Sequence, residues 1–188
     1  MNHLVLLGDS IFDNGAYVEG APSVIDQVRK HLPDNWRATL LAVDGNVANN
    51  VKSQLKRIPV DATHLALSVG GNDALGLSSQ LYDPTPMSIM QALQVLSNIQ
   101  SKFHRSYEQA VDHVASMGKP LLVCTIYDQV PGLSEELRSA LSLFNDVIIE
   151  VALRMGLPVL DLRAVCTDAA DYAVVSPIEP SSSGGDKV

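Results

Sequence analysis

The sequence LVLLGDS at residues 4–10 joins a short, continuously apolar run to a turn of glycine, aspartate and serine. A run that does not alternate with polar residues is typical of a strand buried on both faces of a parallel sheet. Ligands of such sheets bind outside the carboxyl ends of the strands. The sequence therefore predicts that Ser10 lies at the functional edge of a sheet.

Four further apolar runs follow the first. They lie at residues 38–43, 64–69, 120–126 and 157–162. Helical patterns fill the intervals: residues 24–32, residues 46–58, a long helix that starts at Thr85-Pro86 and stops before Gly118, and a helix from Ser134 to Met155. Strands that alternate with helices predict a three-layer α/β/α sandwich with a five-stranded parallel sheet, in one domain over residues 1–188.

Composition narrows the class of protein. Of the 188 residues, 46% are hydrophobic and 18% are charged, and the formal net charge is −8, which disfavours a nucleic-acid partner. No apolar run approaches the roughly 18 residues of a membrane span, and the first run is too short for a signal peptide. Cys124 and Cys166 lie far apart without metal-ligand spacing, so two reduced thiols and a cytoplasmic location are expected.

Polar or glycine residues follow the first three runs directly. They are Gly8-Asp9-Ser10, Asp44-Gly45-Asn46 and Gly70-Gly71-Asn72-Asp73. Each is ordinary turn or cap chemistry when taken alone. Together they could supply a serine hydroxyl and three hydrogen-bond donors for a developing oxyanion: the backbone N–H groups of Ser10 and Gly45 and the side-chain amide of Asn72.

These three segments resemble three of the four sequence blocks of the SGNH, or GDSL-type, hydrolases, in the same order and over essentially the whole chain. The resemblance implies a flavodoxin-like sheet and hydrolysis of a small-molecule ester or acyl substrate without a cofactor. It assigns the nucleophile to Ser10. It assigns the oxyanion hole to the N–H groups of Ser10 and Gly45 and the amide of Asn72.

The fourth block departs from the family pattern Asp-x-x-His. The matching stretch is Ser176-Pro-Ile-Glu179-Pro-Ser, which resembles a bacterial subgroup that carries Ile-Glu-Pro-Ser. Ser176 stands in place of the aspartate and Glu179 in place of the histidine. His3 and His64 begin or precede strands, so we expect them roughly 20 Å from the functional edge. His31, His104 and His113 fall in predicted helices of the outer layers, so no replacement imidazole is expected.

Three hypotheses for the mechanism remain open on the sequence. Glu179 accepts the Ser10 proton; or Ser10 acts slowly through the oxyanion hole alone; or the site has lost hydrolysis and binds a small acylated or carbohydrate ligand. A flavodoxin-like module for phosphate-bearing cofactors does not explain the Gly-Asp-Ser and Gly-x-Asn-Asp segments.

Other features of the predicted edge carry less information. Asp13, Asp73 and Asp128 lie near it, but their spacing matches no metal-binding loop, so no metal is assigned. A leucine-rich loop at residues 74–83 is predicted to border the pocket. Oligomeric state is not specified by the sequence.

Overall fold

The sheet is built of five short parallel strands. In the computed structural model, which describes residues 1–82 and 85–188, they are β1 (Asn2–Gly8), β2 (Trp36–Leu40), β3 (His64–Ser68), β4 (Leu121–Cys124) and β5 (Val159–Leu160). Their order is β2-β1-β3-β4-β5, and each pair of neighbours is parallel. This is the flavodoxin-like order. The predicted fold class is confirmed.

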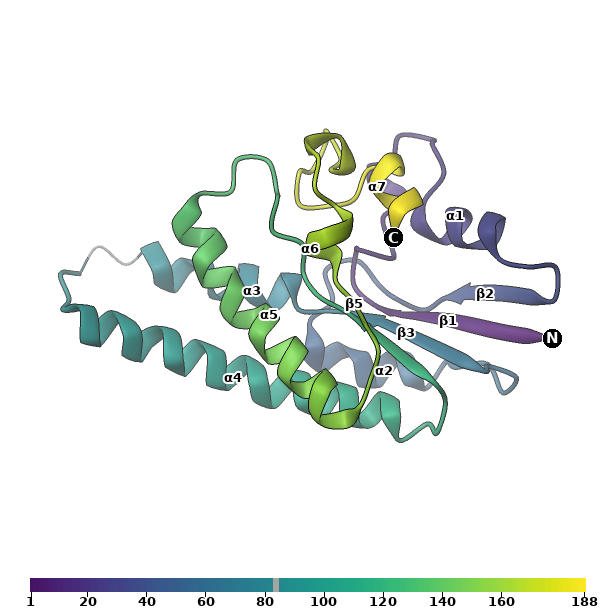
Figure 1. Ribbon diagram of the computed structural model, residues 1–188, viewed down its shortest axis with the longest axis horizontal. Helices are drawn as coiled ribbons and strands as arrows, with labels where there is room; N and C mark the ends of the chain where they lie inside the picture. Colours follow the sequence, from purple (N-terminus) through teal and green to yellow (C-terminus); the bar gives the residue numbers. More distant parts are fainter. Residues whose placement is uncertain (83–84) are drawn as a thin grey trace.

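Helices cover both faces of the sheet and complete three layers (Figure 1). They are α1 (Val24–His31), α2 (Val51–Leu55), α3 (Gly71–Leu77), α4 (Ile89–Ala115), α5 (Glu135–Met155), α6 (Leu162–Val165) and α7 (Ser182–Lys187). Short 3-10 turns, η1 (Gly15–Tyr17), η2 (Ala48–Asn50), η3 (Ser78–Tyr82) and η4 (Ala169–Asp171), connect them. One face carries α2, α4 and α5, and the other carries α1, α6 and α7. None of the described helices is both long and apolar enough to cross a membrane.

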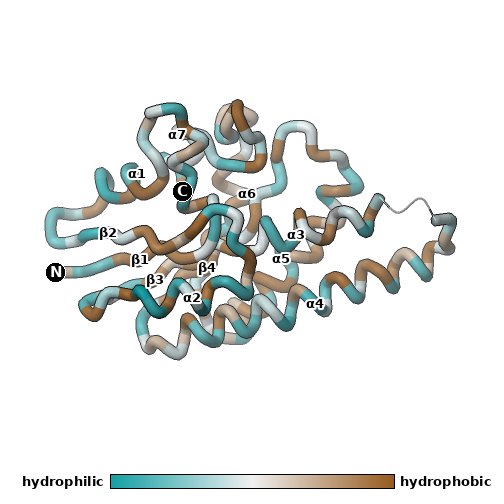
Figure 2. The backbone as a smooth tube through the Cα atoms, turned by 180° about the vertical axis from the view of Figure 1, so that it is seen from behind, coloured by the Kyte–Doolittle hydropathy of each residue, from teal (hydrophilic) through white to brown (hydrophobic). Residues whose placement is uncertain are grey.

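The strands are apolar throughout because both of their faces are buried. Val5 and Leu7 of β1 pack under α2, α4 and α5, whereas Leu6 between them packs under α1 on the other face. Figure 2 shows hydrophobic stretches along the strands at the centre of the molecule, whereas the outer helices carry both hydrophobic and hydrophilic residues. The two buried faces explain why the runs do not alternate with polar residues.

Several element bounds differ from those predicted. Instead of residues 38–43, the second strand occupies Trp36–Leu40, since Leu41 and Ala42 both donate to the Leu6 carbonyl (2.9 Å each) and break the regular ladder. The long helix starts at Ile89 rather than at Thr85. Ser88 caps it: its hydroxyl accepts from the Gln91 N–H at 3.3 Å, and its N–H donates to the Gln91 side chain at 2.8 Å.

Two stretches are helical where the sequence indicated none. The leucine-rich stretch at residues 74–83 is not a loop: it continues α3 and then forms η3, and Asp83 lies outside the described residues. The serine- and glycine-rich end of the chain forms α7. Its first turn is capped by Ser181, whose hydroxyl accepts from the Gly184 N–H at 3.1 Å.

Two buried amide side chains complete the hydrogen bonding at strand ends. Gln54 of α2 accepts from the Gly8 N–H (2.8 Å) and donates to the Gly8 carbonyl (2.7 Å). Asn145 of α5 does the same for Ile126, just after β4, at 2.7 and 2.8 Å. Buried backbone groups need such partners. Both amides therefore stabilise the edge of the sheet at which the candidate site lies.

Candidate active site

The first candidate segment forms a tight turn at the end of β1. Gly8 has φ +121°, and a Cβ there would lie 1.8 Å from the Ser68 carbonyl oxygen, so only glycine fits. The N–H of Asp9 donates to that same carbonyl at 3.0 Å. The chain thus bends against the end of β3 and places Ser10, only 5% exposed, where the order of the strands reverses.

Hydrogen bonds join the loop that carries Gly45 to both neighbouring segments. The Asp13 carboxylate accepts from the Asp44 N–H at 3.0 Å, and the Asn72 amide donates to the Asn46 carbonyl at 3.0 Å. Gly45, between them, has φ +76°. The fold therefore brings Ser10, Gly45 and Asn72 to one edge of the sheet.

Donor groups remain available at this edge. Within residues 1–82 and 85–188, the N–H groups of Ser10 and Gly45 donate to no other group. The Asn72 amide uses one hydrogen on Asn46 and keeps the second. Two backbone N–H groups and one amide hydrogen, from three separate segments, are thus left without an acceptor among the described residues.

The fourth block is held rigidly against these loops. The Glu179 carbonyl accepts from the Ala173 N–H at 2.8 Å. The Tyr127 hydroxyl donates to the carbonyl of the residue before Glu179 at 2.6 Å. Asn14, fully buried four residues after Ser10, donates to the Pro180 carbonyl at 3.0 Å. Glu179 consequently occupies a fixed position beside Ser10.

The Glu179 side chain is a buried carboxyl group, 4% exposed. Burial raises its pKa to about 7, a hydrogen bond with the Ser10 side chain lowers the pKa in part, and the Asp44 charge adds a smaller increase. Its Oε2 atom is buried and has no hydrogen-bond partner among the described residues. This carboxylate can therefore exchange a proton near neutral pH.

Asp9 is a second buried acid at the site, and sequence reasoning did not identify it. Burial raises its pKa to about 8, the Ile11 N–H (3.2 Å from Oδ1) opposes that increase, and the charge of Glu179 adds to it. Burial therefore favours the protonated form of Asp9. In the sequence Asp9 has the character of a turn residue. Its raised pKa comes from burial in the folded protein, which the local sequence does not indicate.

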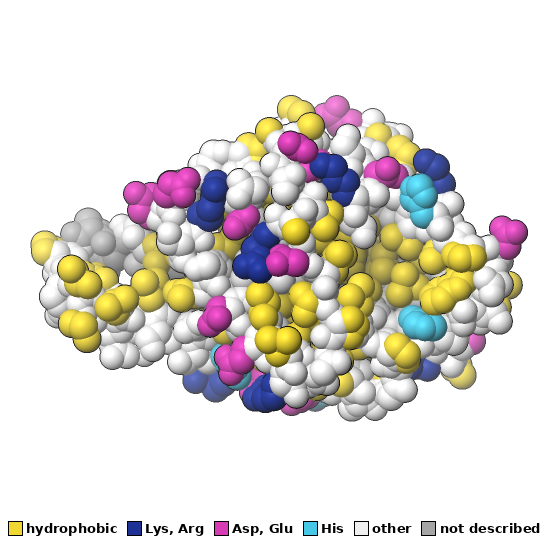
Figure 3. Space-filling view, in the orientation of Figure 1, with side chains coloured by type: hydrophobic (Ala, Val, Ile, Leu, Met, Phe, Trp, Pro, Cys, Tyr) yellow, Lys and Arg dark blue, Asp and Glu magenta, His cyan; other side chains and the backbone are white. Residues whose placement is uncertain are grey.

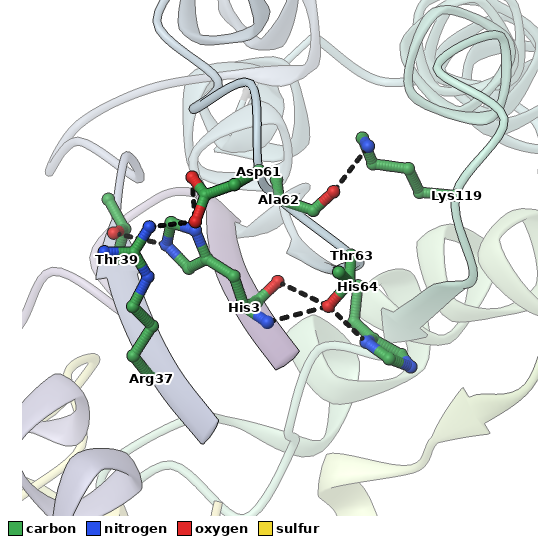
Figure 4. Close-up of polar contacts among 8 residues, drawn as sticks. All are labelled: His3, Arg37, Thr39, Asp61, Ala62, Thr63, His64 and Lys119. Atoms are coloured by element: carbon green, nitrogen blue, oxygen red, sulfur yellow. Dashed lines mark hydrogen bonds and ion pairs between the residues drawn. The ribbon is translucent and has the colours of Figure 1, made fainter. Parts of the chain in front are cut away.

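Histidine side chains lie elsewhere. His3 is buried at the amino end of β1, where its ring nitrogens contact Thr39 (2.8 Å) and Asp61 (3.2 Å), and His64 contacts Thr63 at 2.9 Å (Figure 4). The remaining histidines belong to helices: His31 to α1, and His104 and His113 to α4. All five are described, and none lines the cavity that contains Ser10.

The other carboxylates at this edge of the sheet accept hydrogen bonds from groups in the surrounding loops. Asp13 accepts from the Asp44 N–H, as noted above, and Asp73 accepts from the Ala48 N–H at 2.9 Å. The Asp128 carboxylate accepts from the Gln129 side chain at 3.3 Å. Among residues 1–82 and 85–188, no group of three His, Cys, Asp or Glu side chains is placed to hold a metal ion.

A cavity of about 150 Å³ starts at the candidate residues. Ser10, Asn72 and Glu179 line its polar end, and the remaining walls are mainly apolar side chains of α3, η3 and α5. Ala74, Leu75 and Leu81 belong to these walls, so part of the stretch predicted to border the pocket does so.

Solved structures of ester hydrolases have the same fold. An extracellular lipase from Streptomyces rimosus is 18% identical with a TM-score of 0.71, covering 100% of this chain and 96% of that one. A lipase from a goat rumen metagenome is 17% identical with a TM-score of 0.76, covering 100% and 93%. An acetylxylan esterase from Geobacillus stearothermophilus is 15% identical with a TM-score of 0.67, covering 99% and 90%.

The family follows from the sequence match rather than from this likeness of fold. No curated protein matches the chain at a significant level. The GDSL-like lipase/acylhydrolase family, in contrast, matches residues 6–184, which include all four candidate segments. The chain belongs to the GDSL-like lipase/acylhydrolase family.

Proposed function

We propose that this protein hydrolyses carboxylic esters through an acyl-enzyme on Ser10, with Glu179 as the base. The observation that carries the proposal is that the buried residues Ser10 and Glu179 line the same cavity as Asn72. The Ser10 side chain is also close enough to Glu179 to lower the pKa of its carboxyl group. Two of the similar structures are a lipase and an acetylxylan esterase, which supports this class of reaction.

The proposed reaction has two halves. Glu179 takes the hydroxyl proton as the Ser10 oxygen attacks the ester carbonyl, and the oxyanion accepts from the N–H groups of Ser10 and Gly45 and from the Asn72 amide. As the tetrahedral intermediate collapses, Glu179 returns the proton to the departing alkoxide. Water then attacks the acyl-enzyme, with Glu179 again taking a proton and returning it to the Ser10 oxygen.

The raised pKa makes Glu179 a better base than an ordinary carboxylate. A glutamate that titrates near 4.3 is a weak base, whereas one near 7 is matched to neutral pH. Burial also favours the protonated, uncharged form of Asp9 beside it.

The pH profile tests this proposal. Because the ionised form of Glu179 is the active one, kcat/KM for a short-chain ester is expected to rise with pH through an inflection near 7 and then level off. The measurement covers about pH 5 to 9, with the rate of the Ser10→Ala variant subtracted. An inflection near 4.5, the ordinary value, or a flat profile would contradict a desolvated carboxylate base.

We also infer that residues 1–188 act as one domain in the cytoplasm. The two cysteines, both buried and unpaired, support a reducing compartment. The rival hypothesis of a catalytically silent protein that binds a small acylated or carbohydrate ligand rests on the missing histidine. It predicts no turnover of any ester.

A further inference from the structure

The lining of the cavity at Ser10 is mainly apolar. Its polar residues are Asp9, Ser10, Ser68, Asn72, Thr125, Tyr127 and Glu179. Beyond Ser10, Asn72 and Glu179 the cavity extends between α3–η3 on one side and the first half of α5 on the other. Leu137, Ala140, Leu141 and Phe144 lie on one face of α5, at helical spacing, and form one wall. These side chains provide no hydrogen-bonding groups.

The side chains of Thr125 and Tyr127, two of the polar residues of the lining, already form hydrogen bonds within the protein. The Thr125 hydroxyl donates to Asp161 at 2.8 Å and accepts from the Leu162 N–H at 2.9 Å. The Tyr127 hydroxyl donates to the Ile178 carbonyl. A sugar placed here would leave its hydroxyl groups unpaired, which is costly. The cavity therefore favours a hydrocarbon over a carbohydrate.

Its size sets the length of that hydrocarbon. An apolar protein cavity of about 150 Å³ accommodates benzene, a molecule of six carbon atoms. The cavity here has a similar volume, about 150 Å³. Leu75 and Leu81 border it and are 47% and 37% exposed. Figure 3 shows hydrophobic side chains gathered on the surface over the amino end of α4, beyond this border.

We propose that the substrates are esters of apolar acyl groups of about six carbons, and that the acyl chain lies between α3–η3 and α5. This inference rests on the proposed function, because it names the substrate class of the same site. It separates this chain from an enzyme that removes acetyl groups from carbohydrates. Ala140 is a small residue between the larger Leu137 and Phe144 on this wall, so a larger side chain at position 140 would take up space in the cavity.

A chain-length series tests the inference. With p-nitrophenyl esters from acetate to dodecanoate, kcat/KM is expected to rise about fourfold per methylene up to about six carbons, roughly 10²-fold in total. Beyond six carbons it should level off, because the chain then passes the partly exposed Leu75 and Leu81. A profile that is flat or falls from acetate onward would overturn the inference while leaving ester hydrolysis by Ser10 intact.

Substitutions in the α5 wall of the cavity test whether the acyl chain lies there. Ala140→Phe fills the cavity and should reduce the ratio of hexanoate to acetate kcat/KM from roughly 10² toward 1. Ala140→Leu is a smaller insertion that serves if the phenylalanine variant does not fold. Ser139→Phe is the matched control: Ser139 is exposed on the opposite side of α5, and this variant should keep the ratio. Equal ratios in all variants would contradict the assignment of the cavity.

Binding separates this inference from the proposed chemistry. Calorimetry on the Ser10→Ala variant is expected to show hexanamide binding roughly 10²-fold more tightly than acetamide, and Ala140→Phe on that background should abolish the difference. If no ester is hydrolysed but hexanamide binds in this way, the acyl cavity stands and the Ser10 chemistry fails. If hexanamide binds no better than acetamide, the acyl cavity is wrong.

Discussion

Exchange of Glu179 for glutamine is expected to lower kcat for ester hydrolysis by about 10²-fold to 10⁴-fold, the usual contribution of a positioned general base. Glutamine has nearly the same shape and still accepts a hydrogen bond, but it cannot take the Ser10 proton. Steady-state kinetics on a hexanoate ester measure the effect. Glu19→Gln, at an exposed position, is the control and should retain full activity.

The stability of the same variant distinguishes a catalytic loss from misfolding. Burial raises the pKa of Glu179 from 4.5 to about 7, so the folded protein binds this proton more tightly than the unfolded chain does. The stabilisation from the protonated form is present below pH 4.5 and is lost as the pH rises through 7. At pH 8 the glutamine variant should therefore unfold at a temperature no lower than the wild type. Full activity in that variant would exclude Glu179 as the base.

A rebuilt fourth block provides the complementary test. Ser176→Asp combined with Glu179→His restores the family pattern Asp-x-x-His on an otherwise unchanged edge. If Ser10 is competent, this double variant should be about 10²-fold to 10⁴-fold more active than Glu179→Gln, with an inflection near 6.5. If neither the wild type nor the double variant hydrolyses any ester, the site binds rather than cleaves.

Substitution of Asn72 by alanine is expected to reduce kcat by about 10²-fold to 10³-fold, the usual effect of removing one oxyanion donor. The effect should lie toward the upper end, because the Asn72 amide also holds the carbonyl of Asn46, next to Gly45. Loss of this hydrogen bond also removes a constraint on the loop that carries the Gly45 N–H, the second proposed donor. The measurement is kcat and KM on the same ester.

Asn98→Ala is the control for that substitution. Asn98 is exposed on α4 and does not line the cavity that contains Ser10, so its substitution should leave kcat unchanged. A loss below about threefold in Asn72→Ala, with the fold intact, would mean that the amide does not face the reacting oxygen.

Much of the sheet edge that carries the candidate site was predictable, because buried parallel strands have a distinctive sequence pattern. Strands covered on both faces must be apolar, so the runs located the sheet to within a few residues, and the residues after each run had to meet at one edge. This placed Ser10, Gly45 and Asn72 together. The last strand is shorter than predicted: of the six residues at 157–162, only Val159–Leu160 keep regular pairing.

The electrostatics and the shape of the site were not predictable in the same way. Glu179 and Asp9 are ordinary acids in the sequence, and their raised pKa values come from burial by segments far away in the chain. Gln54 and Asn145 resemble surface residues, yet each pairs with a strand end inside the molecule. The cavity depends on which side chains of α5 face α3, a tertiary feature that no local pattern encodes.

The central claim, that Ser10 is an activated nucleophile, is tested most directly by reaction with a fluorophosphonate followed by mass spectrometry of the intact protein. Such a reagent modifies a serine whose oxygen is activated beside an oxyanion hole. The account predicts a single adduct on Ser10 in the wild type and none in the Ser10→Ala variant. Folded wild-type protein that gains no mass after prolonged exposure, or equal labelling of Ser10→Ala, would contradict it.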